Sequence, residues 1–277
     1  MLGVSDTFNA MIWGKTLGAI FGFLIFNLPG ALLGIWLGHQ FDRGISTNHF
    51  GYARDPEQVK ISFFTTVFKV MGHLAKADGR VSENEIQNAN AVMAHMRLTE
   101  ARRKQAIEHF TQGKQASFNL DACLSEFADT VGNDVSLIQM FLEIQISSAF
   151  ADGSIQPEER RVLERIATRL NVSQMRLNLI INSVQAQHRF YQQQRQYQSS
   201  NQSSKVSLED AYQVLCVNAT ASDAEVKKAY RKMMSQHHPD KLAAKGLPDD
   251  MIEVAKEKTQ EIQSAWELIK NHRGIKK

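Results

Sequence analysis

Three consecutive residues, His238, Pro239 and Asp240, carry side chains suited to a stiff recognition loop. Proline fixes its own φ and has no backbone N–H, so it stiffens an exposed turn. The carboxylate of Asp240 can bind a cation on a partner, and the imidazole of His238 can donate or accept a hydrogen bond. A match of three residues also occurs by chance in unrelated loops. The meaning of this tripeptide therefore depends on the elements that position it.

The segment before the tripeptide is predicted to be a basic amphipathic helix. Ser222 and Glu225 have the spacing of a capping box, which starts a helix. The apolar residues recur on one face, at Val226, Ala229, Tyr230 and Met233. The cations are left for solvent, at Lys227, Lys228, Arg231 and Lys232. Such a face is most often simply solvated, but it can also steer an acidic partner.

A second helix is expected to begin after Pro248 and to pack antiparallel to the basic helix, which places the tripeptide at the tip of a hairpin. Its buried face is predicted at Met251, Ala255, Ile262, Ala265, Trp266 and Ile269. A shorter helix precedes both, with Ser207 as candidate cap. The apolar face of that helix is at Leu208, Ala211, Tyr212 and Leu215.

The capped helix, its basic face, the tip tripeptide and the long helix together resemble the J-domain, the module by which DnaJ-type co-chaperones drive ATP hydrolysis in a DnaK-type chaperone. The resemblance covers residues 206–277 and implies an activator of a partner ATPase, with no enzyme activity of its own. The DnaK-binding residues of the family map onto the tip and the basic face: His238, Pro239, Asp240, Lys227, Lys228, Arg231 and Lys232.

Other chemistry finds little support in the 277 residues. A zinc-protease HExxH pattern, a Ser/His/Asp elbow and a phosphate-binding loop are all absent. The formal net charge of +3 argues against general nucleic-acid binding. Cys123 and Cys216 form no CxxC pair, which favours two reduced thiols. His237 and His238 have no further ligand at metal-binding spacing. We therefore predict no catalytic residue, cofactor or metal.

Residues 16–38 are predicted to be a single transmembrane helix. Residues 16–37 carry no charge, and as a helix they would extend about 33 Å, enough for a hydrocarbon core of about 30 Å. A cleaved signal peptide would have a shorter apolar core. A hairpin turning at residues 27–30 would leave two halves too short to span. Trp13 and Trp36 lie near the two ends, as interfacial anchors would.

The anchor is expected to have a short periplasmic tail, residues 1–15, and a cytoplasmic carboxyl side at the bacterial inner membrane. Positive charges after the span, at Arg43, Arg54 and Lys60, favour this orientation. A DnaK-type partner also needs cytosolic ATP. Glycines recur every four residues along and beside the span, at Gly14, Gly18, Gly22, Gly30, Gly34 and Gly38. This spacing lets two helices approach closely and predicts a homodimer through the membrane helix.

Residues 57–185 are predicted to be helical because apolar residues recur at steps of three and four. One stretch has its expected face at Ile61, Phe64, Val67, Phe68, Met71 and Leu74; another has it at Ile138, Phe141, Leu142, Ile144 and Gln145. Each leads into the same pattern, Ala-Asp-Gly-x-[Val/Ile]-x-x-x-Glu, at 77–85 and 151–159. This repeat resembles the TerB-like helical fold, named for tellurite-resistance proteins.

The repeated Asp-Gly turn also looks like half of an EF-hand loop. Leu74 and Lys76, however, occupy loop positions that need oxygen ligands. Capped helix turns are the favoured interpretation, since glycine suits the turn and carboxylates suit the start of a helix. A shared divalent site stays open as an alternative, built from Asp78, Glu85, Asp152 and Glu159.

Glutamine and serine dominate residues 186–205, which predicts a flexible linker that tethers the last domain. Glutamine and arginine are good helix formers, so an alternative is that the preceding helix continues to about Arg195. The overall expectation is an all-α chain with an anchor, a TerB-like domain and a terminal J-domain. This layout resembles membrane-anchored DnaJ-like proteins of Gram-negative bacteria, which further implies a link to envelope-stress signalling and capsule synthesis. The alternative is a membrane-tethered scaffold whose central domain binds a protein or a divalent metal.

Overall fold

The structure is a computed structural model. It describes residues 55–77, 83–150, 153–199 and 208–275. These residues belong to one structural unit and contain helices but no strand, which confirms the all-α prediction for this part. No helix within these ranges is long and apolar enough to span a membrane. The predicted tail, transmembrane helix and six glycines lie outside the described residues.

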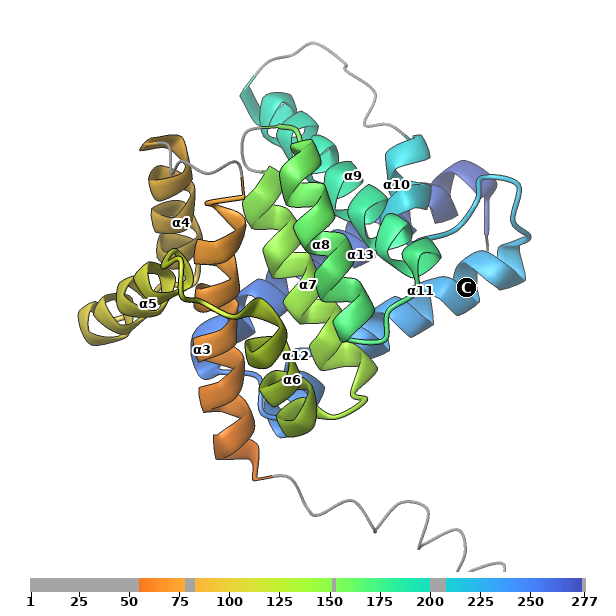
Figure 1. The fold of residues 1–277 in the computed structure, drawn as a ribbon. Helices are drawn as coiled ribbons and strands as arrows, with labels where there is room; N and C mark the ends of the chain where they lie inside the picture. Colours follow the sequence, from red (N-terminus) through yellow and green to blue (C-terminus); the bar gives the residue numbers. More distant parts are fainter. Residues whose placement is uncertain (1–54, 78–82, 151–152, 200–207, 276–277) are drawn as a thin grey trace, which may run out of the picture. The chain divides into compact units, whose positions relative to one another are not determined.

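Seven helices build the central region and the passage to the last domain (Figure 1). They are α3 (Pro56–Leu74), α4 (Glu83–His95), α5 (Glu100–Gly113), α6 (Leu120–Val131), α7 (Val135–Ala149), α8 (Pro157–Arg169) and α9 (Gln174–Ser199).

Helix α3 starts at a complete N-cap and runs through the core. The carboxylate of Asp55 accepts a hydrogen bond from the Glu57 amide at 3.0 Å, and Pro56 occupies the first turn. Phe63 and Phe68 are fully buried, but Ile61 is 61 % exposed, so its predicted place on the buried face is wrong. Helices α5, α6 and α7 all pack against α3, and the face they leave open contains Ile61.

Helix α7 is buried on nearly all sides, with every residue from Leu137 to Ile146 buried. Helices α3, α8 and α9 surround it, and α11 of the last domain also contacts it. Three of its buried residues are polar: Gln139, Glu143 and Gln145. A buried polar group needs a partner, so these side chains must be satisfied from neighbouring helices.

The second Asp-Gly turn supports the capping interpretation as far as it is described. Gly153 has φ +88°, a backbone conformation that favours glycine. Pro157 begins α8, and the Glu159 carboxylate accepts a hydrogen bond from the Gln156 amide at 2.8 Å. Among the described residues no group of three metal-ligating side chains occurs. Asp78 and Asp152 lie outside that part, so the shared divalent site is untested.

The last domain is formed by α10 (Leu208–Val214), α11 (Asp223–His237), α12 (Pro239–Ala244), the 3₁₀ helix η2 (Asp249–Met251) and α13 (Ile252–Arg273). The expected capping box is present, because the Ser222 hydroxyl accepts from the Glu225 amide and the Glu225 carboxylate accepts from the Ser222 amide. Helices α11 and α13 pack together, and the rings of Tyr230 and Trp266 stack 5.0 Å apart. All six apolar positions predicted for the long helix are buried.

Helix α9 belongs to the cores of both domains. Leu177 and Ile181, in its first half, pack in the central core. Ala186 and Phe190, further along, pack in the core of the last domain, beside α10. The helix continues to Ser199, so it occupies most of the 186–205 segment that was expected to be a flexible linker. The apolar side chains at 186 and 190 explain the difference, because they give this glutamine-rich helix a buried face.

Candidate functional site

The His-Pro-Asp tip lies at the junction of α11 and α12. His238 is extended, with φ −61° and ψ 122°, and Pro239 begins the short helix α12. The Nδ1 atom of His238 accepts a hydrogen bond from the Asp240 amide at 3.2 Å. That bond places the ring hydrogen on Nε2. His238 and Asp240 are exposed and Pro239 is half-buried, so a donor and a carboxylate face solvent from one turn.

The basic face of α11 is exposed at all four predicted positions: Lys227, Lys228, Arg231 and Lys232. None of them forms an ion pair with another residue of the described part. Arg231 donates only to the carbonyl of Lys227, at 3.4 Å. These four cations are therefore available to an acidic surface, together with the tip.

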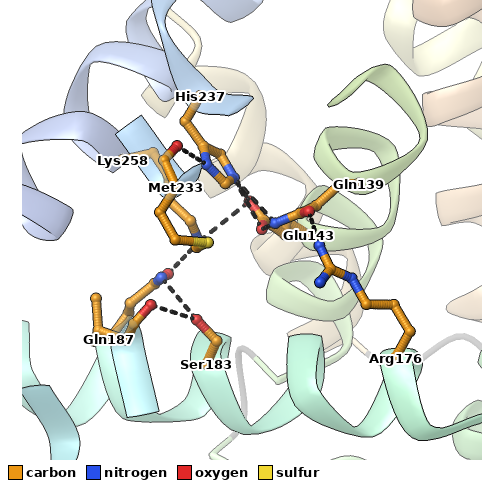
Figure 2. Close-up of polar contacts among 9 residues, drawn as sticks. Gln139, Glu143, Arg176, Ser183, Gln187, Met233, His237 and Lys258 are labelled. Atoms are coloured by element: carbon orange, nitrogen blue, oxygen red, sulfur yellow. Dashed lines mark hydrogen bonds and ion pairs between the residues drawn. The ribbon is translucent and has the colours of Figure 1, made fainter. Parts of the chain in front are cut away.

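The residue directly before the tip, His237, is only 1 % exposed and is bound to the central domain (Figure 2). Its Nε2 atom lies 3.0 Å from each carboxylate oxygen of Glu143 on α7. Lys258 of α13 is also buried, with its Nζ 3.3 Å from Glu143. Sequence reasoning missed this contact. The only signal for it was a pair of polar residues, Gln139 and Glu143, one turn apart in an apolar helix.

The ionisation of Glu143 is set by its two cationic neighbours. Burial by itself disfavours the charged carboxylate, but the charges of His237 and Lys258 outweigh it and hold the pKa of Glu143 below its ordinary value. Hydrogen bonds from His237 and from the Gln139 amide, the latter at 2.8 Å, act in the same direction. Glu143 is therefore a carboxylate that joins two elements of the last domain, α11 and α13.

The residues after the tip are also bound to the central domain. Leu242 of α12 and Leu247 are fully buried in the same apolar core as α3 and α7. Gly246 has φ +94°, and a Cβ added there would meet the Val59 side chain at 2.7 Å. The Lys245 ammonium lies 3.0 Å from the Asp134 carboxylate at the start of α7.

No other arrangement in the described residues suggests chemistry. Burial raises the pKa of the Cys123 and Cys216 thiols, which makes them poor nucleophiles at neutral pH. His109 is half-buried on α5, and burial lowers its pKa. Neither cysteine forms a disulfide.

A helical hairpin with an exposed His-Pro-Asp tip and a basic face defines the class of J-domain proteins, and comparison with known families supports this class. Residues 210–276 match the DnaJ domain family, and residues 65–181 match the family of the tellurite resistance protein TerB. Residues 10–55 match the transmembrane domain of the co-chaperone DjlA.

Full-length relatives define the family more narrowly. The co-chaperone protein DjlA of Vibrio cholerae is 46 % identical over 282 residues, covering 96 % of this chain and 99 % of the relative. Those of Yersinia pestis and Coxiella burnetii are each 43 % identical, over 274 and 272 residues, covering 95 % and 96 % of this chain and 99 % and 100 % of theirs. No solved structure matches. The chain belongs to the DjlA family of membrane-anchored J-domain co-chaperones.

Proposed function

We propose that this chain recruits a DnaK-type chaperone to the inner membrane and stimulates its ATP hydrolysis through His238, Pro239 and Asp240. The observation that supports this most strongly is the exposure of the tip and of the four cations beside it, while His237 before the tip and Leu242 after it are buried. The four cations form no ion pair within the described residues, so they can meet an acidic surface of a partner.

The chain itself contributes recognition, and the partner performs the hydrolysis. The Asp240 carboxylate can accept hydrogen bonds from a cation of the chaperone. The Nε2 hydrogen of His238 can be donated to an acceptor there, and Pro239 limits the motion of both. The four cations of α11 raise the rate of encounter with an acidic chaperone surface and fix the orientation of docking.

Anchoring adds a location to this activity. In this proposal the tail of residues 1–15 is periplasmic, the carboxyl side is cytoplasmic, and two anchors associate through their glycines. The glycine spacing predicts that Gly18→Leu and Gly34→Leu each weaken self-association of the full chain in bilayers. Unchanged association for both would remove the glycine face. The link to envelope-stress signalling and capsule synthesis rests on the family resemblance.

The direct test is single-turnover ATP hydrolysis by DnaK with the full chain in lipid nanodiscs. Native protein is compared with His238→Gln and with the control His272→Gln, which changes an exposed histidine in the last turn of α13. We expect His238→Gln to lower the stimulated rate about tenfold or more, as loss of a central contact residue does. The control should match the native protein. Equal rates for His238→Gln and native protein would refute the proposal.

A further inference from the structure

We propose that the central domain holds the J-domain in one fixed placement, and that Glu143 is the positioning residue for the His-Pro-Asp tip. This inference deepens the proposed function and rests on it. It assigns the TerB-like region a part in activating the chaperone, through contacts on both sides of the tip, in place of a role as a separate module on a tether.

The contact before the tip is a charged hydrogen-bond network. The Nδ1 atom of His237 lies 2.9 Å from the carbonyl oxygen of Met233, and Nε2 lies 3.0 Å from both oxygens of Glu143. Both neighbours are acceptor oxygens, and a ring that donates to both of them from its two nitrogens is an imidazolium. A buried imidazolium needs its counter-charge, which ties the end of α11 to α7.

The other charged groups around this ring come from α9 and α13. Lys258 and Glu261 lie on α13; burial is the main influence on Glu261 and raises its pKa. Arg176 of α9 donates to Gln139, whose amide is 3.4 Å from His237 Nε2 (Figure 2). Lys258 also donates to Gln187 on α9. The network therefore joins α7 and α9 to both limbs of the J-domain hairpin.

The contact after the tip is apolar and close. Leu242 and Leu247 are buried in the central core, and Met251 of η2 joins them. At Gly246 the backbone approaches α3 so closely that a Cβ would lie 2.9 Å from the carbonyl oxygen of Pro56. Arg102 of α5 adds an ion pair to Asp250, with Nε to Oδ2 at 2.7 Å. Between His237 and Leu242, the side chains of His238, Asp240 and Lys241 are exposed and Pro239 is half-buried.

This arrangement preorganises the tip. Fixing the backbone of a loop costs conformational entropy when it occurs on binding, and a loop that is already fixed at both ends avoids most of that cost. The docked J-domain also keeps its four cations exposed, so docking does not cover the surface that the chaperone is expected to bind. The placement therefore favours activation of the partner.

The test compares Glu143→Met with the double variant Glu143→Met/Lys258→Met, both as full chains in nanodiscs. The single change leaves the buried Lys258 ammonium without a carboxylate, which should open the contact between domains. In the double variant, His237 can be neutral, donating from Nδ1 to Met233 and accepting from the nearby Gln139 amide. Glu164→Gln, at an exposed ion pair on α8, is the control.

Hydrogen exchange of residues 242–247 reports the contact, and DnaK turnover against co-chaperone concentration reports the function. For Glu143→Met we expect faster exchange and a maximal stimulated rate at least about threefold lower. The half-saturating concentration should stay unchanged, because the basic face is intact. In the double variant, the exchange rate of residues 242–247 and the maximal stimulated rate should both return to the native values.

Two outcomes would overturn the inference while leaving the proposed function intact: an opened contact with an unchanged maximal rate, or with a higher one. Loss of stimulation by His238→Gln is independent of both. If Glu143→Met does not fold, a covalent cross-link between the J-domain and the central domain tests the inference instead. Lys245→Cys and Ser136→Cys replace side chains in hydrogen-bond contact at 3.1 Å and can be joined by a short bis-maleimide. Full stimulation by the linked protein supports the placement; loss of stimulation, absent from either single-cysteine control, contradicts it.

Discussion

Helix α11 presents two kinds of charge that behave in opposite ways. On its outer face, four cations are exposed and form no ion pair within the described residues. At its end, five residues after Lys232, His237 is buried and bound to a carboxylate of another domain. An exposed charge is hydrated and adds little to stability, whereas a buried charge is costly unless it is paired.

The exposed face and the buried end of α11 therefore have different functions. The outer face can change with little effect on the fold, and it determines how a partner is met. The buried end determines where the tip lies, because the geometry of a buried ion pair is fixed by its surroundings. Each region can be altered without altering the other, so the division can be tested.

The largest effect is expected from Leu242→Ala, which removes a side chain packed in the central core and leaves the His-Pro-Asp tip unchanged. Leu242 is fully buried in the central core, so the change should lower the free energy of unfolding by about 2–5 kcal/mol. Urea unfolding monitored by circular dichroism measures it. Leu179→Ala is the control, since Leu179 is 40 % exposed and should change the midpoint little. Similar losses for both would mean that α12 is not seated in the core.

The next effect concerns pH and the buried carboxylate. The folded protein holds the pKa of Glu143 below its ordinary value of 4.5, so acid protonates this group first in the unfolded chain. Its contribution is present above about pH 4.5 and is lost as pH falls below that value. Urea midpoints of native protein should therefore fall more steeply below pH 4.5 than between pH 6 and pH 4.5. Midpoints that fall evenly over the whole range would contradict the charged state of Glu143.

A smaller effect is expected at the four exposed cations on the outer face of α11. Replacing Lys227, Lys228, Arg231 and Lys232 together by glutamine should leave the free energy of unfolding within about 0.5 kcal/mol per site. The half-saturating concentration for DnaK turnover should rise about tenfold and lose most of its salt dependence. Lys104→Gln, an exposed lysine on α5, is the control. An unchanged concentration dependence would assign the four cations to solvation alone.

The smallest effect is expected at an exposed ion-pair site of the central domain. Hydrogen bonds from Arg165 and then Arg169 lower the pKa of Asp121 to about 2. This stabilisation is present above pH 4 and fades toward pH 2. Because solvent screens the site, Asp121→Asn should shift the urea midpoint at pH 7 barely above error. A shift as large as that of Leu242→Ala would contradict the contrast between exposed and buried charge.

The sequence predicted the local features of the J-domain well because they depend on neighbours in the chain. The capping box at Ser222 and Glu225 and the exposed cations follow from helical spacing alone. The spacing of residues within a helix does not show what each face of that helix packs against. It therefore placed Ile61 in the core, where the structure exposes it, and left His237 without a role. The partner of His237 is 94 residues away in the sequence, on a largely apolar helix in which Gln139 and Glu143 were the only signal.

The most direct measurement is hydrogen exchange of the full chain in nanodiscs, with and without ATP-bound DnaK. We predict that residues 226–241 gain protection when DnaK binds, while residues 242–247 are protected already in the free protein and stay so. Either of two results would contradict the proposal that the tip is exposed and that the central domain fixes the residues on both sides of it. One is absence of protection at the tip; the other is faster exchange at residues 135–149 and 242–247 in the complex.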